Sequence, residues 1–147
     1  MDITKYWCEE LIMSIITLAS PAEKQIEIIG IGITGDEMLI DFDSSLTWVK
    51  DNYVNNGYFS EKNIKKLNEF DKYLDEVIKG QKEDFFVDNN ELINNPIWEE
   101  IREKAKALLK DLEMSNLDIT LDRTISELDN NDRIIIENTK RTLIPQK

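Results

Sequence analysis

The chain has no histidine and only one cysteine, Cys8, among its 147 residues. Without an imidazole there is no Cys–His pair, no Ser–His triad, no histidine general base and no histidine metal ligand. A single cysteine excludes an intramolecular disulfide and suits a reducing compartment. Because Cys8 stands among Trp7, Leu11 and Ile12, we interpret it as a thiol packed in the core. These absences predict a cytoplasmic protein that is not an enzyme.

Glycine and proline are also scarce, with five and three residues respectively. So few turn-forming residues favour long helices over the many turns of a β-sandwich. No apolar stretch approaches the roughly 20 residues of a membrane span. The run from Leu11 to Ala19 contains Ser14 and Thr17 and follows Glu9-Glu10, which is unlike the core of a signal peptide. We therefore expect no membrane association.

What the chain has in excess is negative charge, with a formal net charge of -12 at pH 7. Residues 1–60 hold 10 acidic and 3 basic side chains, whereas residues 115–147 hold 6 and 5. A negative field repels nucleic acid and anionic membranes and attracts basic proteins. We expect a basic protein partner that meets the N-terminal half. The plainer alternative is that the charge only keeps the protein soluble.

Apolar residues recur at helical spacing in four segments, which are 4–19, 36–53, 60–80 and 96–113. Asp36, Ser60 and Asn95 are the expected N-caps of the last three helices, and Pro96 fits the first helical position after Asn95. Residues 22–29 fit either a helix or a strand, and residues 81–95 are expected to form a loop.

The C-terminal tail leaves two alternatives. Thr124-Ile125-Ser126-Glu127 fits a capping box, which predicts a helix from residue 125. Arg133–Ile136 and Thr142–Ile144 fit equally well as the two strands of a hairpin. We predict an all-α fold in which residues 1–147 form one domain, a bundle of four or five helices, with a short β-hairpin in the tail as the alternative.

The loop motifs that bind phosphate or calcium are incomplete. Residues 30–35 read G-I-G-I-T-G, one residue too short for a dinucleotide-binding fingerprint, so we expect a connector. Residues 41–45 begin like a calcium-binding loop, but Leu46 replaces the required glycine and Asn52 the required glutamate. Residues 129–140 fail in the same way. No metal and no cofactor are therefore expected.

The strongest indication of an enzyme is Glu99-Glu100-Ile101-Arg102-Glu103. It resembles the E-E-x-x-E half-motif of all-helical nucleotide pyrophosphohydrolases, in which carboxylates on facing helices hold magnesium. That reading would make Glu99, Glu100, Glu103 and Glu127 the ligands, although the second half-motif ends at Asn130 instead of Asp. The alternative is a solvated helix face with salt bridges to nearby lysines and Arg102.

Two stretches carry a resemblance to a known class of proteins. They are Thr34–Asp43, which reads T-G-D-E-M-L-I-D-F-D, and the segment from Gly57–Glu61 through Phe70–Leu74 to Pro96–Ile101. Together they are similar to small acidic immunity proteins of polymorphic and contact-dependent growth-inhibition toxin systems in bacteria. The resemblance implies a binding protein that neutralises a cognate basic toxin, such as a nuclease, by forming a tight complex. The other hypotheses are the magnesium-dependent hydrolase and an interaction module with no inhibitory role.

The helix over 36–53 supplies the candidate partner-binding residues. Its apolar stripe of Leu39, Phe42, Leu46, Val49 and Tyr53 is expected to face the core. Glu37, Trp48 and Asp51 then project near the opposite side, with Asp41 close by. An aromatic side chain among carboxylates is typical of a binding hot spot for a basic partner. The competing interpretation packs Trp48 and Ile40 against a second layer of the bundle.

Overall fold

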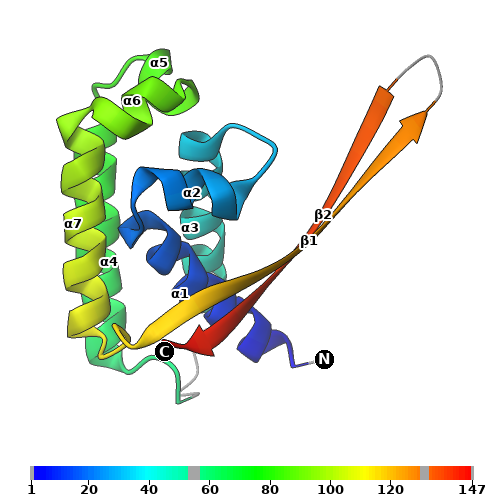
Figure 1. Cartoon of the computed structure of the whole chain (residues 1–147). Helices are drawn as coiled ribbons and strands as arrows, with labels where there is room; N and C mark the ends of the chain where they lie inside the picture. Colours follow the sequence, from blue (N-terminus) through cyan, green and yellow to red (C-terminus); the bar gives the residue numbers. More distant parts are fainter. Residues whose placement is uncertain (1, 53–56, 130–132, 147) are drawn as a thin grey trace.

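A computed structural model describes residues 2–52, 57–129 and 133–146, and for residues 125–138 it describes the backbone alone. The helices are α1 (Ile3–Ala19), α2 (Ala22–Ile29), α3 (Thr34–Asp51), α4 (Glu61–Ile78), α5 (Glu83–Val87), α6 (Asn89–Asn94) and α7 (Pro96–Asp111). The strands are β1 (Leu117–Asp129) and β2 (Arg133–Pro145). The fold is mostly helical with a C-terminal hairpin, as the sequence predicted (Figure 1).

Short polar side chains cap three of the long helices, α1, α4 and α7. The Asp2 carboxylate accepts hydrogen bonds from two backbone amides of the first turn of α1. Ser60 and Asn63 form a reciprocal capping box at α4. Asn95 caps α7, with Pro96 in the first turn as predicted. In α3 the helix begins earlier than expected, so Asp36 lies in its first turn and is not the N-cap.

Residues 81–95 were predicted to be a loop, and that prediction was wrong, because they contain α5 and α6. These helices are too short to show a period in the sequence. Tertiary packing stabilises them, since Phe85 of α5 is buried and stacks on Trp98 of α7 with ring centroids 4.7 Å apart. The Trp98 indole N–H also donates to the Phe85 carbonyl at 3.0 Å. Residues 22–29, left open between helix and strand, form α2.

The tail is a long antiparallel hairpin. Its register pairs Leu117 with Pro145 and Asp129 with Arg133. The helix expected from residue 125 is therefore absent, and Thr124–Glu127 lie in β1. The two segments proposed as opposite strands, Arg133–Ile136 and Thr142–Ile144, both belong to β2. The strand ladder runs along the whole length of β1 and β2 and overrides the local capping pattern.

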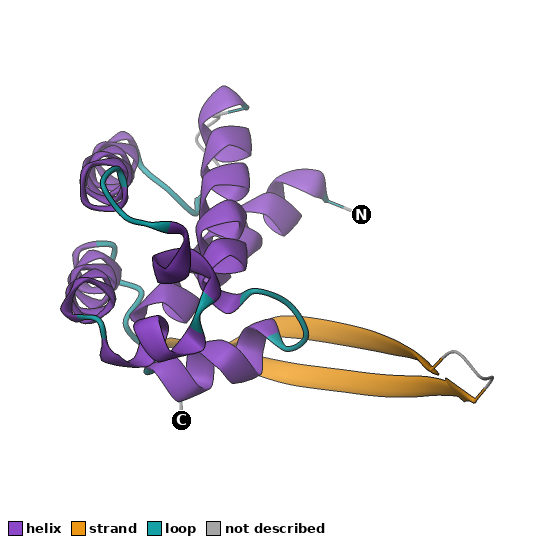
Figure 2. Ribbon diagram, turned by 90° about the horizontal axis from the view of Figure 1, so that it is seen from above, coloured by secondary structure: helices purple, strands orange, loops and turns teal. Residues whose placement is uncertain are grey.

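The base of the hairpin rests on the helical body. Figures 1 and 2 show it crossing α1 and then extending away from the helices. At the base Ile119 is buried, and Leu121 and Leu143 pack against the core. Arg123 fixes the crossing, because its guanidinium donates to the carbonyls of Glu27 and Ile28 at 2.6 and 3.2 Å. Those carbonyls end α2, where a cation is favoured.

The core forms where α1 packs against α3 and α7. Cys8, predicted to be a packed thiol, is fully buried there. Arg102 of α7 is only 4% exposed and joins three elements. Its guanidinium donates to the Gln25 side-chain oxygen of α2 at 3.2 Å and to the Leu92 carbonyl of α6 at 3.0 Å. Of the helices in the described ranges, none is long and apolar enough to cross a membrane.

Candidate partner-binding surface

The outer face of α3 carries the predicted binding residues. Glu37 and Asp51 are exposed, and Asp41 is half-buried. Ile40 is exposed to 54%, so it does not pack against a second layer. The opposite face carries Phe42, Leu46 and Val49, which are buried in the core as the periodicity predicted. Leu39 is partly buried, and Tyr53 lies outside the described residues.

Trp48 lies between these two faces. It is half-buried and packs against the core cluster. Its ring stacks on Trp7 of α1, with centroids 5.9 Å apart and planes 15° apart. Trp7 in turn meets Tyr6 edge-on at 5.3 Å. Trp48 is therefore shared between helix packing and the surface, because one side of the indole is used by α1.

Asp41 has an ionic partner that the sequence did not indicate. The Arg141 guanidinium of β2 lies 3.5 Å from its carboxylate. Burial raises the pKa of Asp41, while Arg141 opposes that rise and Glu37 adds to it. The side chains of Arg141 and Asp41 are 26% and 40% exposed, so the pair is partly solvated. It joins the base of the hairpin to α3.

Glu10 of α1 belongs to the same electrostatic group as Asp41 and Arg141. Burial raises the pKa of Glu10, Arg141 lowers it, and Asp41 raises it further. Tyr6 belongs to the same electrostatic group, because the Glu10 charge is the largest cause that raises the pKa of its hydroxyl. Two half-buried carboxylates thus lie in the field of one guanidinium, which pairs with Asp41, and the group keeps a net negative charge.

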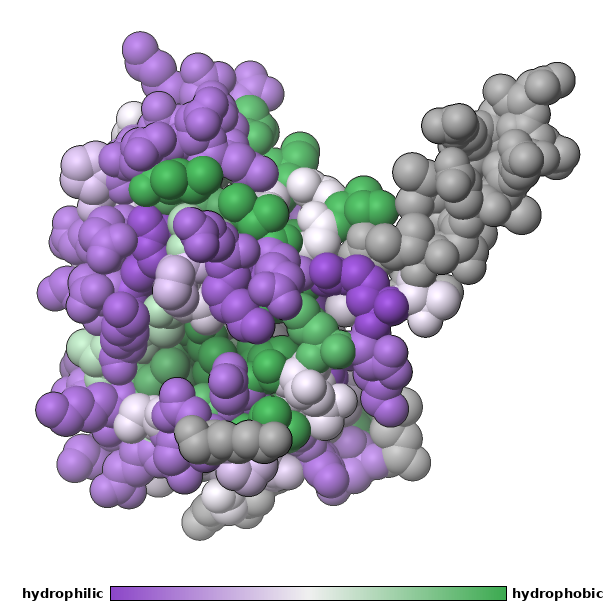
Figure 3. Space-filling view, viewed as in Figure 1, coloured by the Kyte–Doolittle hydropathy of each residue, from purple (hydrophilic) through white to green (hydrophobic). Residues whose placement is uncertain are grey.

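We call this region the hairpin-base surface and define it by Tyr6, Glu10, Glu37, Ile40, Asp41 and Arg141. It combines two exposed apolar or aromatic side chains with three carboxylates, and it lies where α1, α3 and β2 meet. In Figure 3, hydrophobic patches appear among polar ones on the face that carries the hairpin. A surface of this composition can bind a partner that brings cations and some apolar area.

The four predicted residues are spread over α3 and do not form one cluster. Glu37 and Asp41 are one turn apart, but Asp51 lies about 21 Å further along the axis than Glu37 at 1.5 Å per residue. Sequence reasoning missed Glu10 and Arg141. The Glu9-Glu10 pair at the edge of an apolar helix stripe was a usable indication for Glu10. Arg141 had none, because its position depends on how the hairpin crosses the helices.

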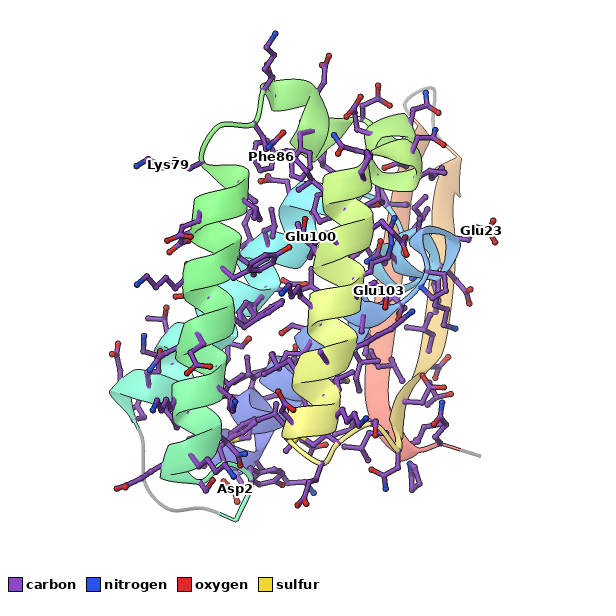
Figure 4. The ribbon with its side chains drawn as sticks, turned by 90° about the vertical axis from the view of Figure 1, so that its left-hand side faces the viewer. Asp2, Glu23, Lys79, Phe86, Glu100 and Glu103 are labelled. Atoms are coloured by element: carbon purple, nitrogen blue, oxygen red, sulfur yellow. The ribbon has the colours of Figure 1, made fainter. Side chains whose placement is uncertain are left out.

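The four candidate magnesium ligands lie on two elements, three of them on α7 and Glu127 on β1. Glu99 pairs with Arg102 at 3.1 Å, and Glu103 pairs with Lys106 at 3.2 Å. Figure 4 shows Glu100 and Glu103 on different sides of α7. Glu127 lies on β1, not on a facing helix. Among the side chains that the structure describes, which do not include those of residues 125–138, no group of three or more acidic or cysteine side chains is placed to hold a metal ion.

The other motifs have structural roles. The segment 41–52, which begins like a calcium-binding loop, is helical and continues α3 to Asp51. Gly30 and Gly32, both with positive φ, connect α2 to α3 as predicted. Gly35 lies inside α3 against α5 and α7. A β-carbon there would come within 2.8 Å of the Phe86 carbonyl oxygen, so the close approach needs glycine.

Comparison of the chain with known proteins finds no relative. No family of known proteins, no curated protein and no solved structure matches the chain.

Proposed function

We propose that this protein binds a cognate basic toxin domain and neutralises it, acting as an immunity protein. The observation that carries the proposal is the hairpin-base surface, where Arg141 pairs with Asp41 and also influences Glu10 electrostatically. The exposed Ile40 and Tyr6 belong to the same surface. A lysine or arginine of the partner would supply the cation that this group lacks. The exposed apolar side chains would supply the desolvated area that anchors such contacts.

The overall charge supports the same proposal. At -12 the chain attracts a basic protein over a range of about 8–10 Å at physiological ionic strength and speeds its association. Toxins that cleave nucleic acid carry basic surfaces because they approach phosphates. An acidic protein that covers such a surface blocks substrate access without any catalytic group of its own. The resemblance of Thr34–Asp43 and the following helices to immunity proteins points in the same direction.

The test begins with the gene encoded immediately upstream, which the proposal expects to contain a toxin domain. Co-expression with this protein should restore growth of cells that produce the toxin. The purified pair should associate severalfold more slowly at physiological than at low ionic strength. The double variant Glu37→Gln/Asp41→Asn should reduce the low-salt association rate. Glu76→Gln, an exposed carboxylate on α4 away from the hairpin, is the control and should have a smaller effect.

Two results would contradict the proposal. One is the absence of growth rescue by the wild-type chain when the toxin is produced at sublethal levels. The other is an association rate that does not change with salt, which would remove the electrostatic basis of the hairpin-base surface.

A further inference from the structure

A groove of about 240 Å³ lies between α3 and α4. Figure 4 shows α3, in cyan, passing behind α4, in green. The inner part of the groove is apolar, because Phe42 and Leu74 line it and are only 1% and 4% exposed. Leu39 and Ile78, which also line it, are half-buried. The groove therefore offers apolar surface that the packing of the two helices leaves partly open.

The other residues that line the groove are aspartates. They are Asp43 of α3 and Asp71 and Asp75 of α4, and no lysine or arginine among the described residues lines the groove with them. Lys72 and Lys79 lie within one turn of Asp75 on α4, but both are exposed and neither is part of the lining. The lining thus carries three negative charges and no positive one.

These carboxylates have no partner among the side chains that the structure describes, neither an ion pair nor a hydrogen bond. Asp71 is half-buried, and burial raises its pKa. Asp75 and Asp43 raise the pKa of Asp71 further, whereas Lys50 opposes the rise. Like charges one turn apart, as Asp71 and Asp75 are, also destabilise a helix. The fold therefore holds negative charge at this groove that a cation from outside would stabilise.

We propose that an arginine side chain of a basic protein partner binds in this groove, with its stem against the apolar residues and its guanidinium at the aspartates. Arginine combines an apolar stem with a cationic head, as the lining requires. The guanidinium has five donors in one plane and can serve two carboxylates at once, whereas a lysine ammonium is a point charge. The groove is smaller than the roughly 300–1,000 Å³ of pockets for drug-sized ligands, which suits a single side chain.

The groove lies on the opposite side of α3 from the hairpin-base surface. Leu39 and Asp43 are displaced by two residues from Glu37 and Asp41, which is about 200° around the helix at 100° per residue. A helix with its side chains is about 10–12 Å across, so an interface of ordinary size can include both surfaces. The arginine contact rests on the proposed function only for the identity of the protein that carries the arginine.

The first experiment titrates the full-length protein with small probes and follows the methyl signals of Leu39, Leu74 and Ile78 by NMR. The probe N-acetyl-arginine amide should shift these signals at low salt with a Kd on the order of 1–10 mM. Its uncharged isostere, N-acetyl-citrulline amide, should bind at least about tenfold more weakly, because it keeps the stem and loses the charge. N-acetyl-lysine amide and putrescine should bind about threefold more weakly than the arginine probe.

Matched variants test the carboxylates. Asp71→Asn/Asp75→Asn should raise the Kd of the arginine probe roughly tenfold at low salt. Glu69→Gln/Glu76→Gln removes the same charge from exposed positions of α4 outside the groove and should change the Kd by less than about twofold. Circular dichroism checks the fold of each variant.

Lys50 provides a test in the opposite direction. Its charge lowers the pKa of Asp71, so it stabilises the same carboxylate that the probe needs. Lys50→Gln should therefore lower the Kd of the arginine probe by about twofold at low salt.

The second experiment uses the purified partner and identifies which of its residues enters the groove. Replacing that one arginine of the partner by lysine should weaken the complex with the wild-type protein about tenfold. The same replacement should have a clearly smaller effect on the complex with the Asp71→Asn/Asp75→Asn variant, because contacting residues are coupled.

Any of the following results would overturn the proposal. They are no shift of the methyl signals at about ten times the expected Kd, a Kd unchanged by Asp71→Asn/Asp75→Asn, equal or tighter binding of the citrulline, lysine or putrescine probe, or a partner in which no arginine is coupled to these aspartates. Growth rescue is measured without probes, so a failed titration leaves toxin neutralisation open. If growth rescue fails, the probe titration alone decides whether the groove binds arginine.

Discussion

Trp48 is the one aromatic side chain among the predicted binding residues. Replacing it by alanine distinguishes a structural role from a binding role. Trp48 is half-buried and stacks on Trp7. Full burial of a tryptophan is worth about 3–5 kcal/mol relative to alanine. Because one side of the ring is open, we expect Trp48→Ala to lower the free energy of unfolding by about 2–3 kcal/mol. That is a large share of the roughly 5–15 kcal/mol by which domains are stable.

The stacking contribution can be isolated with a double-mutant cycle. Trp7→Ala and Trp48→Ala together should cost less than the sum of the single variants by about 0.5–1.5 kcal/mol, the coupling expected of an aromatic pair. Asp51→Asn, on an exposed position of the same helix, should change stability by less than about 0.5 kcal/mol.

Urea denaturation followed by circular dichroism measures all of these variants, with the m-value as a check that the unfolded states are comparable. A loss below about 1 kcal/mol for Trp48→Ala, with no coupling to Trp7, would refute the packing argument. That result would favour the interpretation of Trp48 as a binding hot spot that points outward. A loss of the expected size instead assigns the partner contact to the carboxylates and Ile40 of the hairpin-base surface.

Two further predictions concern charge and the buried network. Burial raises the folded-state pKa of Glu10 and Asp41 above the unfolded values. Their ionisation therefore opposes folding at pH 7. This penalty disappears as the pH falls through the raised pKa values. The contribution of Glu10 to the free energy of unfolding should therefore rise as the pH is lowered from 7 through its raised pKa, as urea denaturation measures. Glu10→Gln should remove that rise, and an unchanged pH dependence in the variant would contradict the assignment. Arg102→Met should cost about 3 kcal/mol, because the Gln25 oxygen and the Leu92 carbonyl lose a buried donor. A midpoint shift in urea corresponding to less than about 1 kcal/mol would mean that water replaces the guanidinium.

The long helices were predictable because their information is local. The apolar spacing in 4–19 and 96–113, the Ser60 cap and the Asn95-Pro96 pair all act within one or two turns of the chain. Those elements form with nearly the expected bounds. The burial of Phe42, Leu46 and Val49 followed from the same spacing. Composition likewise determined the excess of negative charge and the absence of histidine chemistry.

Contacts between distant residues decided the rest. The helix α5 depends on Trp98 of α7, and α6 on Arg102, which donates to the Leu92 carbonyl; the sequence did not indicate either helix. In the tail, the capping pattern at Thr124 favoured a helix, but the residues form a strand ladder instead. That ladder joins residues up to 28 positions apart, Leu117 with Pro145. The hairpin-base surface exists only because that ladder brings Arg141 to within 3.5 Å of Asp41, a hundred residues earlier in the chain. A residue's local sequence determines which helix face it occupies, but the charges that surround it are set by the packing of the whole chain.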